Sequence, residues 1–221
     1  MTERWATFDC YGTLIDWEGG LRGSLAQLWP GQDVELLRHR YHQLEPIVQA
    51  GRALPYREVQ RRTLRALAAV EDLALAPGQD ARLAEALPNW TAFVDVPPAL
   101  TALRDHGWRL AILSNTDPDF LAASVEHIGV PIDLRITAAD AGSYKPALGH
   151  WQTFYARTGA SPKRHVHVAA SAFHDLAPAA SLAIPAVWIN REAETSNLPR
   201  AAELPDLTAL PATVERLVPV S

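Results

Sequence analysis

Alternation of short apolar segments with stretches of helical periodicity constrains the fold of this chain more than any other feature. The apolar segments are rich in β-branched and aromatic residues, as buried strands are. Strands and helices that alternate at such short intervals imply right-handed crossovers, and hence a parallel sheet with helices on both faces. The predicted strands are Trp5–Phe8, Arg109–Leu113, Leu134–Thr137, His165–Ala169 and Ala186–Ile189.

Two of the intervening helices are clear in the sequence. After the second strand, Asp117 is a suitable N-cap and Gly129 a suitable stop, with apolar residues at helical spacing between them. The stretch 150–159 repeats this arrangement with aromatic residues. The fold class that we predict is therefore α/β, with a Rossmann-like parallel sheet as its core.

Between Asp16 and about Val96 strand signals nearly vanish and helical periodicity takes over. Because the first strand precedes this stretch and the other strands follow it, we expect an inserted helical cap. Such a cap would sit over the carboxyl ends of the strands, where open α/β sheets bind ligands. We predict a core made of residues 1–15 and 97–221 and a cap made of residues 16–96, with the tail from residue 196 forming a loop and a short closing helix.

Composition excludes several classes of partner. Hydrophobic residues make up 48% of the chain and charged residues 20%, which fits a folded protein with a substantial core. A net charge of −5, with the charges mixed along the chain, provides no basic stripe for nucleic acid or an anionic membrane. The single cysteine, Cys10, agrees with a reducing compartment. With no signal-peptide pattern and no apolar run of membrane-spanning length, we expect a soluble, cytoplasmic protein.

Polar residues follow the ends of four predicted strands. Asp9 ends the first, Ser114 and Asn115 end the second, Lys145 follows the third and Asp175 the fourth. Taken alone, each could be a turn residue or a solvated surface residue. Together they should meet at one edge of the sheet, where a carboxylate beside an ammonium and hydroxyl or amide donors suits a nucleophile better than a structural acid.

These segments resemble the motifs of the haloacid dehalogenase (HAD) superfamily. "FDCYGTLID", "ILSNT", "YKP" and "HVAASAFHD" occur in the order of the superfamily's motifs and span most of the chain. The phosphatases of the superfamily have a second aspartate two positions after the first, which protonates the leaving alkoxide beside magnesium. Here that position is Tyr11, whose high intrinsic pKa makes it a poor proton donor at neutral pH. Since a halide leaves without a proton, the chain looks like the L-2-haloacid dehalogenase (type II) branch.

The resemblance implies a role for each matching residue. Asp9 would be the nucleophile that forms an ester, Thr13 would orient it, Lys145 would keep it charged, and Asp175 would activate the hydrolytic water. The other matches would bind substrate or halide. Ser114 and Asn115 would hold the substrate carboxylate or the ester oxygen, Tyr11 would contribute to an apolar wall, and Arg40 of "RYHQLE" would receive the halide.

The chain also departs from the pattern of this branch. The family's Ser-Ser-Asn before the fourth-strand acid is replaced by a sequence that contains Ala170 and Ala172. Trp151 stands where a tyrosine is usual, and His174 precedes the acid where an apolar aromatic residue is usual. These departures suggest that the branch is kept while the preferred substrate differs.

The function that we predict is hydrolysis of short 2-haloalkanoic acids through an aspartyl ester on Asp9, without a metal or another cofactor. Asp175 alone supplies too few carboxylates in its loop for a hard-cation site. Two alternatives remain open: a magnesium-dependent HAD phosphatase for a small metabolite, and an inactive HAD-fold binding module. The expected partner is a small-molecule substrate, and the resemblance is compatible with a homodimer formed through the cap helices.

Overall fold

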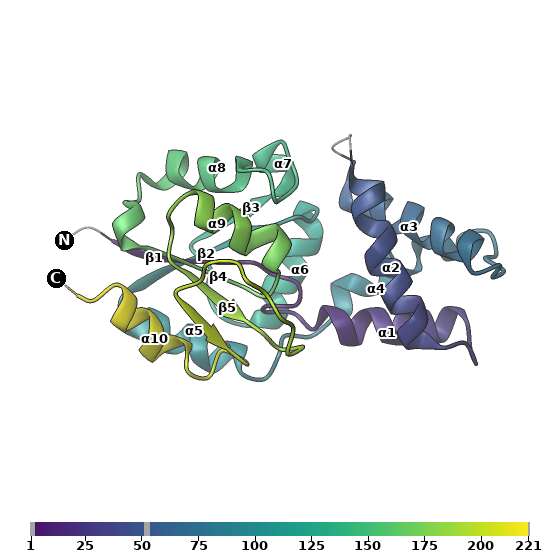
Figure 1. The fold of residues 1–221 in the computed structure, drawn as a ribbon, viewed down its shortest axis with the longest axis horizontal. Helices are drawn as coiled ribbons and strands as arrows, with labels where there is room; N and C mark the ends of the chain where they lie inside the picture. Colours follow the sequence, from purple (N-terminus) through teal and green to yellow (C-terminus); the bar gives the residue numbers. More distant parts are fainter. Residues whose placement is uncertain (1–2, 51–53, 221) are drawn as a thin grey trace.

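The computed structural model describes residues 3–50 and 54–220, with a sheet of parallel strands beside a group of helices (Figure 1). Residues 1–2, 51–53 and 221, which belong to the predicted core and cap, lie outside the described residues. The sheet has six strands in the order β3-β2-β1-β4-β5-β6. The strands are β1 (Arg4–Phe8), β2 (Trp108–Ser114), β3 (Leu134–Thr137), β4 (His165–Ala169), β5 (Ala186–Ile189) and β6 (Ala202–Leu204).

The predicted parallel sheet is confirmed, and the five predicted strands are all present. β1 and β2 extend slightly beyond their predicted limits, and the other three have the predicted limits. The edge strand β6 lies in the tail that we predicted to be a loop before the closing helix. Its three residues are too few for a period to be recognised, and Ala202 and Glu203 obtain their strand conformation by pairing with β5.

Helices cover both faces of the sheet. Helices α5 (Val96–Asp105), α6 (Pro118–Ile128) and α10 (Leu210–Leu217) pack on the face that carries Phe8 and Val168. Helices α8 (Gly149–Thr158) and α9 (Ala177–Ser181) pack on the opposite face, against Trp5 and Trp188, and the short helix α7 (Ala138–Ala141) follows β3. Because both faces are covered, β1 and β4 are buried along their whole lengths.

Helices α1 (Trp17–Leu28), α2 (Val34–Gln49), α3 (Tyr56–Val70) and α4 (Arg82–Ala86) form a separate group, which we call the cap (Figure 1). All four fall within the predicted cap segment. The two connections between cap and sheet run antiparallel and are hydrogen-bonded to each other, from Asp16 N to Thr91 O at 3.0 Å and from Phe93 N to Leu14 O at 3.0 Å. Both chain crossings therefore occur at one place beside the end of β1. No helix in the described part of the chain is long and apolar enough to span a membrane.

Candidate active site

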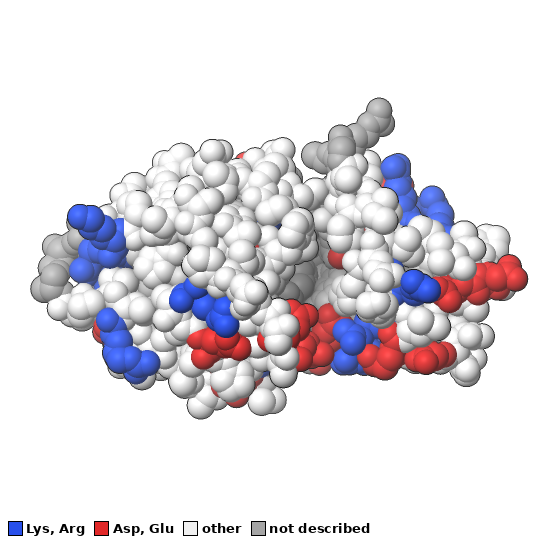
Figure 2. Space-filling model, viewed as in Figure 1, with Lys and Arg blue, Asp and Glu red and all other residues white. Residues whose placement is uncertain are grey.

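A cavity of about 700 Å³ lies between the carboxyl ends of the strands and the cap. Its floor includes Asp9, Ser114, Lys145 and Asp175, which come from four different strand-end loops. Figure 2 shows the hollow between core and cap, with acidic side chains gathered beside it. The loops that sequence reasoning placed at one edge of the sheet thus line one cavity.

Asp9 directly follows β1 and is 8% exposed. Thr13 Oγ1 donates to its Oδ2 at 3.0 Å, and Lys145 Nζ donates to its Oδ1 at 2.8 Å. Thr13 Oγ1 in turn accepts from Ala170 N at 2.9 Å, so the residue that orients Asp9 is itself fixed. The turn between them passes through Gly12 at φ +82°, a conformation in which a side chain would be strained. Asp9 is therefore a carboxylate held in a defined orientation beside a cavity, as a nucleophile requires.

Lys145 is buried, and its ammonium group connects the two carboxylates of the site. Besides Asp9 it donates to Asp175 Oδ1 at 2.7 Å and to Leu113 O at 2.9 Å, which uses all three of its hydrogens. Burial by itself lowers the pKa of this ammonium, but Asp175 and then Asp9 raise it above its ordinary value. Lys145 thus places a positive charge between the two carboxylates of the site.

Asp175 lies on a single π-helical turn, Ala172–Leu176, immediately after β4. Its Oδ1 accepts from Lys145 and lies 2.9 Å from His167 Nε2, whereas its buried Oδ2 has no partner among the described residues. Burial by itself raises the pKa of this carboxyl, but the Lys145 charge and the hydrogen bond from His167 hold it well below its usual range. The result is an ionised carboxylate with one free oxygen, which suits a base that accepts a proton from water.

Tyr11 lies in the cavity wall but cannot serve as an acid there. Ser124 Oγ donates to Phe120 O at 3.0 Å, so the Tyr11 hydroxyl, 3.0 Å from Ser124 Oγ, is the donor between the two. Burial raises the pKa of the phenol well above its ordinary value. Its ring lies 5.7 Å from the ring of Trp17, centroid to centroid. Tyr11 therefore supplies an apolar surface rather than a proton.

The two polar residues at the end of β2 differ in their contacts. Ser114 Oγ is buried beside the cavity and has no partner among the described residues. Both ends of the Asn115 amide bind the backbone of Lys145, with Nδ2 donating to its carbonyl at 3.0 Å and Oδ1 accepting from its N–H at 2.6 Å. Ser114 is free to bind a ligand, whereas Asn115 holds the lysine loop in position.

The structure does not bring Arg40 into the cavity. Its Nε donates to Glu71 Oε1 at 3.1 Å, on the outside of α2, while Arg38 lines the cavity. The difference comes from helix geometry. Residues that are two positions apart, such as Arg38 and Arg40, are separated by about 200° around the helix axis and so point to nearly opposite sides. Leu37 and Tyr41 are the buried residues of α2. A helical wheel with these two residues on the inner face places Arg38 and Arg40 on different sides of the helix.

Other polar residues of the cap were also missed by sequence reasoning. Arg38 Nη1 donates to Glu18 Oε2 at 2.9 Å, and His42 Nε2 lies 2.9 Å from Glu18 Oε1. Burial by itself lowers the pKa of His42, but Glu18 raises it above its ordinary value. Glu45, which accepts from Tyr56 Oη at 2.8 Å, also lines the cavity. The cap side of the cavity is therefore more polar than the apolar wall that we predicted around Tyr11.

The residues that depart from the family pattern occupy three different settings. Trp151 is fully buried on α8, with its ring 5.2 Å from the ring of His167, and it does not line the cavity. His174 does line the cavity, and its Nδ1 lies 3.1 Å from Ser171 Oγ rather than against Asp175. Ala170 and Ala172 line the cavity without a polar side chain, so the protein contacts of Asp175 come from Lys145 and His167 instead.

Comparisons with known proteins agree with this geometry. The family model for haloacid dehalogenase-like hydrolases matches residues 4–182. The (S)-2-haloacid dehalogenase of Pseudomonas sp. (strain YL) is 29% identical over 217 residues, which cover 94% of this chain and 91% of that protein. Haloacetate dehalogenase H-2 of Moraxella sp. (strain B) is 29% identical over 191 residues, which cover 83% of this chain and 84% of that protein. A crystal structure of an L-2-haloacid dehalogenase matches with a TM-score of 0.86 at 25% identity, over 97% of this chain and 100% of that one.

Proposed function

The chain belongs to the haloacid dehalogenase-like hydrolases, and on this basis we propose that it hydrolyses short 2-haloalkanoic acids to halide and 2-hydroxy acids. Relatives and structural neighbours that are named as dehalogenases of 2-haloacids support this choice of bond. The observation that carries the proposal is the pairing of an Asp9 carboxylate oriented by Thr13 and Lys145 with a Tyr11 hydroxyl that is bound to Ser124. Such a site can attack carbon but has no acid at the position from which phosphatases protonate an alkoxide.

In the first step, one Asp9 oxygen attacks the halogen-bearing carbon from the side opposite the halogen. The new C–O bond forms as the C–X bond breaks, so the halogen leaves with the bonding electron pair and the carbon inverts. Arg38, which lines the cavity, replaces Arg40 as our candidate for halide binding. Ser114 Oγ, which has no protein partner, is the candidate donor to the substrate carboxylate.

In the second step, water attacks the carbonyl carbon of the Asp9 ester while Asp175 Oδ2 accepts a proton from it. Lys145, 2.8 Å from Asp9 Oδ1, stabilises the oxyanion of the tetrahedral intermediate. When that intermediate collapses, the bond breaks between the Asp9 carbonyl carbon and the oxygen that is joined to the substrate carbon. This oxygen leaves with the product and takes one of the two water protons. The other proton leaves the enzyme, so each turnover consumes one water and yields a 2-hydroxy acid, a halide ion and a proton.

The experiment that tests the proposal is halide release from chloro-, bromo- and fluoroacetate and from both enantiomers of 2-chloropropionate, with EDTA present. We expect release from at least one substrate, and no release by the Asp9→Asn variant. Magnesium-stimulated hydrolysis of p-nitrophenyl phosphate without any halide release would instead favour the phosphatase alternative. If the protein shows neither activity, the remaining alternative is an inactive binding module with the HAD fold.

A further inference from the structure

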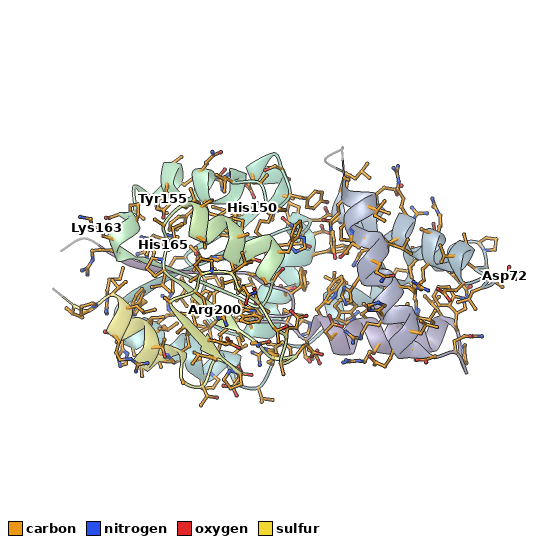
Figure 3. All side chains as sticks on the ribbon, in the orientation of Figure 1. Asp72, His150, Tyr155, Lys163, His165 and Arg200 are labelled. Atoms are coloured by element: carbon orange, nitrogen blue, oxygen red, sulfur yellow. The ribbon has the colours of Figure 1, made fainter. Side chains whose placement is uncertain are left out.

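A chain of buried polar side chains leads from Asp175 to the far end of the sheet. Thr7 Oγ1 lies between the two histidines of β4, 2.8 Å from His167 Nδ1 and 2.7 Å from His165 Nε2. Tyr155 Oη of α8 lies 2.7 Å from His165 Nδ1. Tyr155 and His165 lie at the end of the core that is remote from the cap (Figure 3). The chain therefore starts at the cavity and ends outside it, and the mechanism above uses none of its members beyond Asp175.

Hydrogen counts give one consistent direction for the hydrogen bonds of this chain when Tyr155 is taken as a donor. Asp175 is ionised and can only accept, so the hydrogen between it and His167 belongs to His167 Nε2. Burial raises the pKa of Tyr155 to about 12, so its hydroxyl keeps its hydrogen. Burial lowers the pKa of His165 to about 3, so that ring is neutral and has one N–H. With Tyr155 donating to Nδ1 of His165, that N–H is at Nε2 and points to Thr7.

Thr7 then has one hydrogen left to give, and the remaining acceptor is His167 Nδ1. In this arrangement every donor in the chain points toward Asp175, with His167 Nδ1 accepting from Thr7 and His167 Nε2 donating to Asp175. Aromatic rings keep water away from the chain: Trp151 is 5.2 Å from His167 and Phe154 is 4.8 Å from His165, between ring centroids. Thr7, His165 and His167 are all fully buried. Because every polar side-chain atom of these three residues is paired, they are held rigidly, since each alternative would leave an unpaired group.

We propose that His167 is a positioning residue that holds Asp175 for the attack on the Asp9 ester, and that Thr7, His165 and Tyr155 hold His167 in the required tautomer. The inference rests on the proposed function. Lys145 and His167 both occupy Oδ1, which leaves Oδ2, without a partner among the described residues, as the oxygen to accept a proton from water. Ala170 and Ala172, which lie beside Asp175 in the cavity wall, have no polar side chain to orient it from above. His167 therefore does this from within the sheet.

The test compares His167→Leu with His167→Gln, since the glutamine amide can still donate to Asp175 and leucine cannot. Rapid-quench halide release measures ester formation, and intact-protein mass spectrometry measures the ester that accumulates. For His167→Leu we expect ester formation within about threefold of the wild type, and ester hydrolysis slower by about ten- to a hundredfold, the usual effect of a lost hydrogen bond to a charged group. A halide burst of about one equivalent per site should then appear, and His167→Gln should restore most of the rate.

Val166→Ala is the control, because Val166 is buried on the same strand but faces the other side of the sheet. It should leave the ratio of the two rates unchanged. Equal slowing of both steps in His167→Leu, or unchanged hydrolysis, would overturn the proposal. If His167→Leu does not fold, Thr7→Val decides: slower hydrolysis with normal ester formation supports the proposal, and unchanged hydrolysis overturns it.

A spectroscopic measurement needs no substrate. The ¹⁵N chemical shifts of His167 should show a hydrogen on Nε2 and a bare Nδ1 in the wild type, and a mixture of tautomers in Tyr155→Phe. A wild-type ring with its hydrogen on Nδ1 would overturn the proposal. Failure of the proposed function would show differently, as absence of halide release by the wild type.

Discussion

Replacing Lys145 by methionine should destabilise the fold and abolish ester formation together. Methionine keeps most of the length of the lysine side chain but removes the ammonium that lies 2.8 Å from Asp9 Oδ1 and 2.7 Å from Asp175 Oδ1. Removing one partner of a buried ion pair costs about 3–5 kcal/mol. Asp9 borders the cavity and His167 still donates to Asp175, so we expect a loss at the lower end, about 3 kcal/mol at pH 7.

The dependence of this loss on pH follows from the two pKa shifts. The pKa of Asp175 is lowered, so its contribution to stability is present above its unfolded value of roughly 4 and is lost as pH falls through its folded value. The pKa of Lys145 is raised, so its contribution is present below roughly 10 and is lost as pH rises through its folded value. The difference in unfolding free energy should therefore be largest between about pH 5 and 10 and should shrink in acid.

Urea unfolding of the wild type and the variant at pH 7 and at about pH 2.5, inside the range over which Asp175 loses its contribution, measures this difference. The matched control is Lys163→Met, because Lys163 is exposed at the far end of the core (Figure 3). It should change the unfolding free energy by less than about 0.5 kcal/mol. An equal loss for Lys145→Met at the two pH values, or a loss no larger than that of the control, would refute the assignment of Lys145 as the charge that holds both carboxylates.

Further predictions concern the cavity. Arg38→Ala should lower kcat/KM for halide release by about tenfold or more, whereas Arg40→Ala should stay within about twofold, as measured by steady-state kinetics; the reverse order would restore Arg40 to the site. Tyr11→Phe should keep activity within about threefold, since the hydroxyl is bound to Ser124 and gives no proton to the reaction; a loss above a hundredfold would show that the phenol takes part. Thr13→Val should slow ester formation by about tenfold, with a stopped-flow rate equal to that of the wild type counting against its orienting role.

The sequence allowed the prediction of those features that depend on topology. Asp9, Lys145 and Asp175 were predicted to meet because parallel strands bring their carboxyl ends to one edge, and their distances now agree with that prediction. The motif match points to Arg40, because a match of residue types does not show in which direction a helical residue points. For the same reason the motif does not identify Arg38, which lines the cavity.

Other features depended on contacts that no local pattern contains. His167 was interpreted only as part of a buried strand, because its polar neighbours are Thr7 on another strand and Asp175 after the next turn. The strand β6 exists through its pairing with β5. In each case the partner belongs to a different secondary-structure element, so the periodicity of the residue's own segment does not reveal the contact.

The most direct test of the account is a single turnover in H₂¹⁸O, with enzyme in excess over a 2-haloacid and EDTA present. If Asp9 forms the ester and water attacks its carbonyl carbon, one ¹⁸O atom should appear in the proteolytic peptide that contains Asp9, and the 2-hydroxy acid of that first turnover should carry none. Label in the hydroxy acid and none in the peptide would mean that water attacks the substrate carbon directly, and would contradict the account.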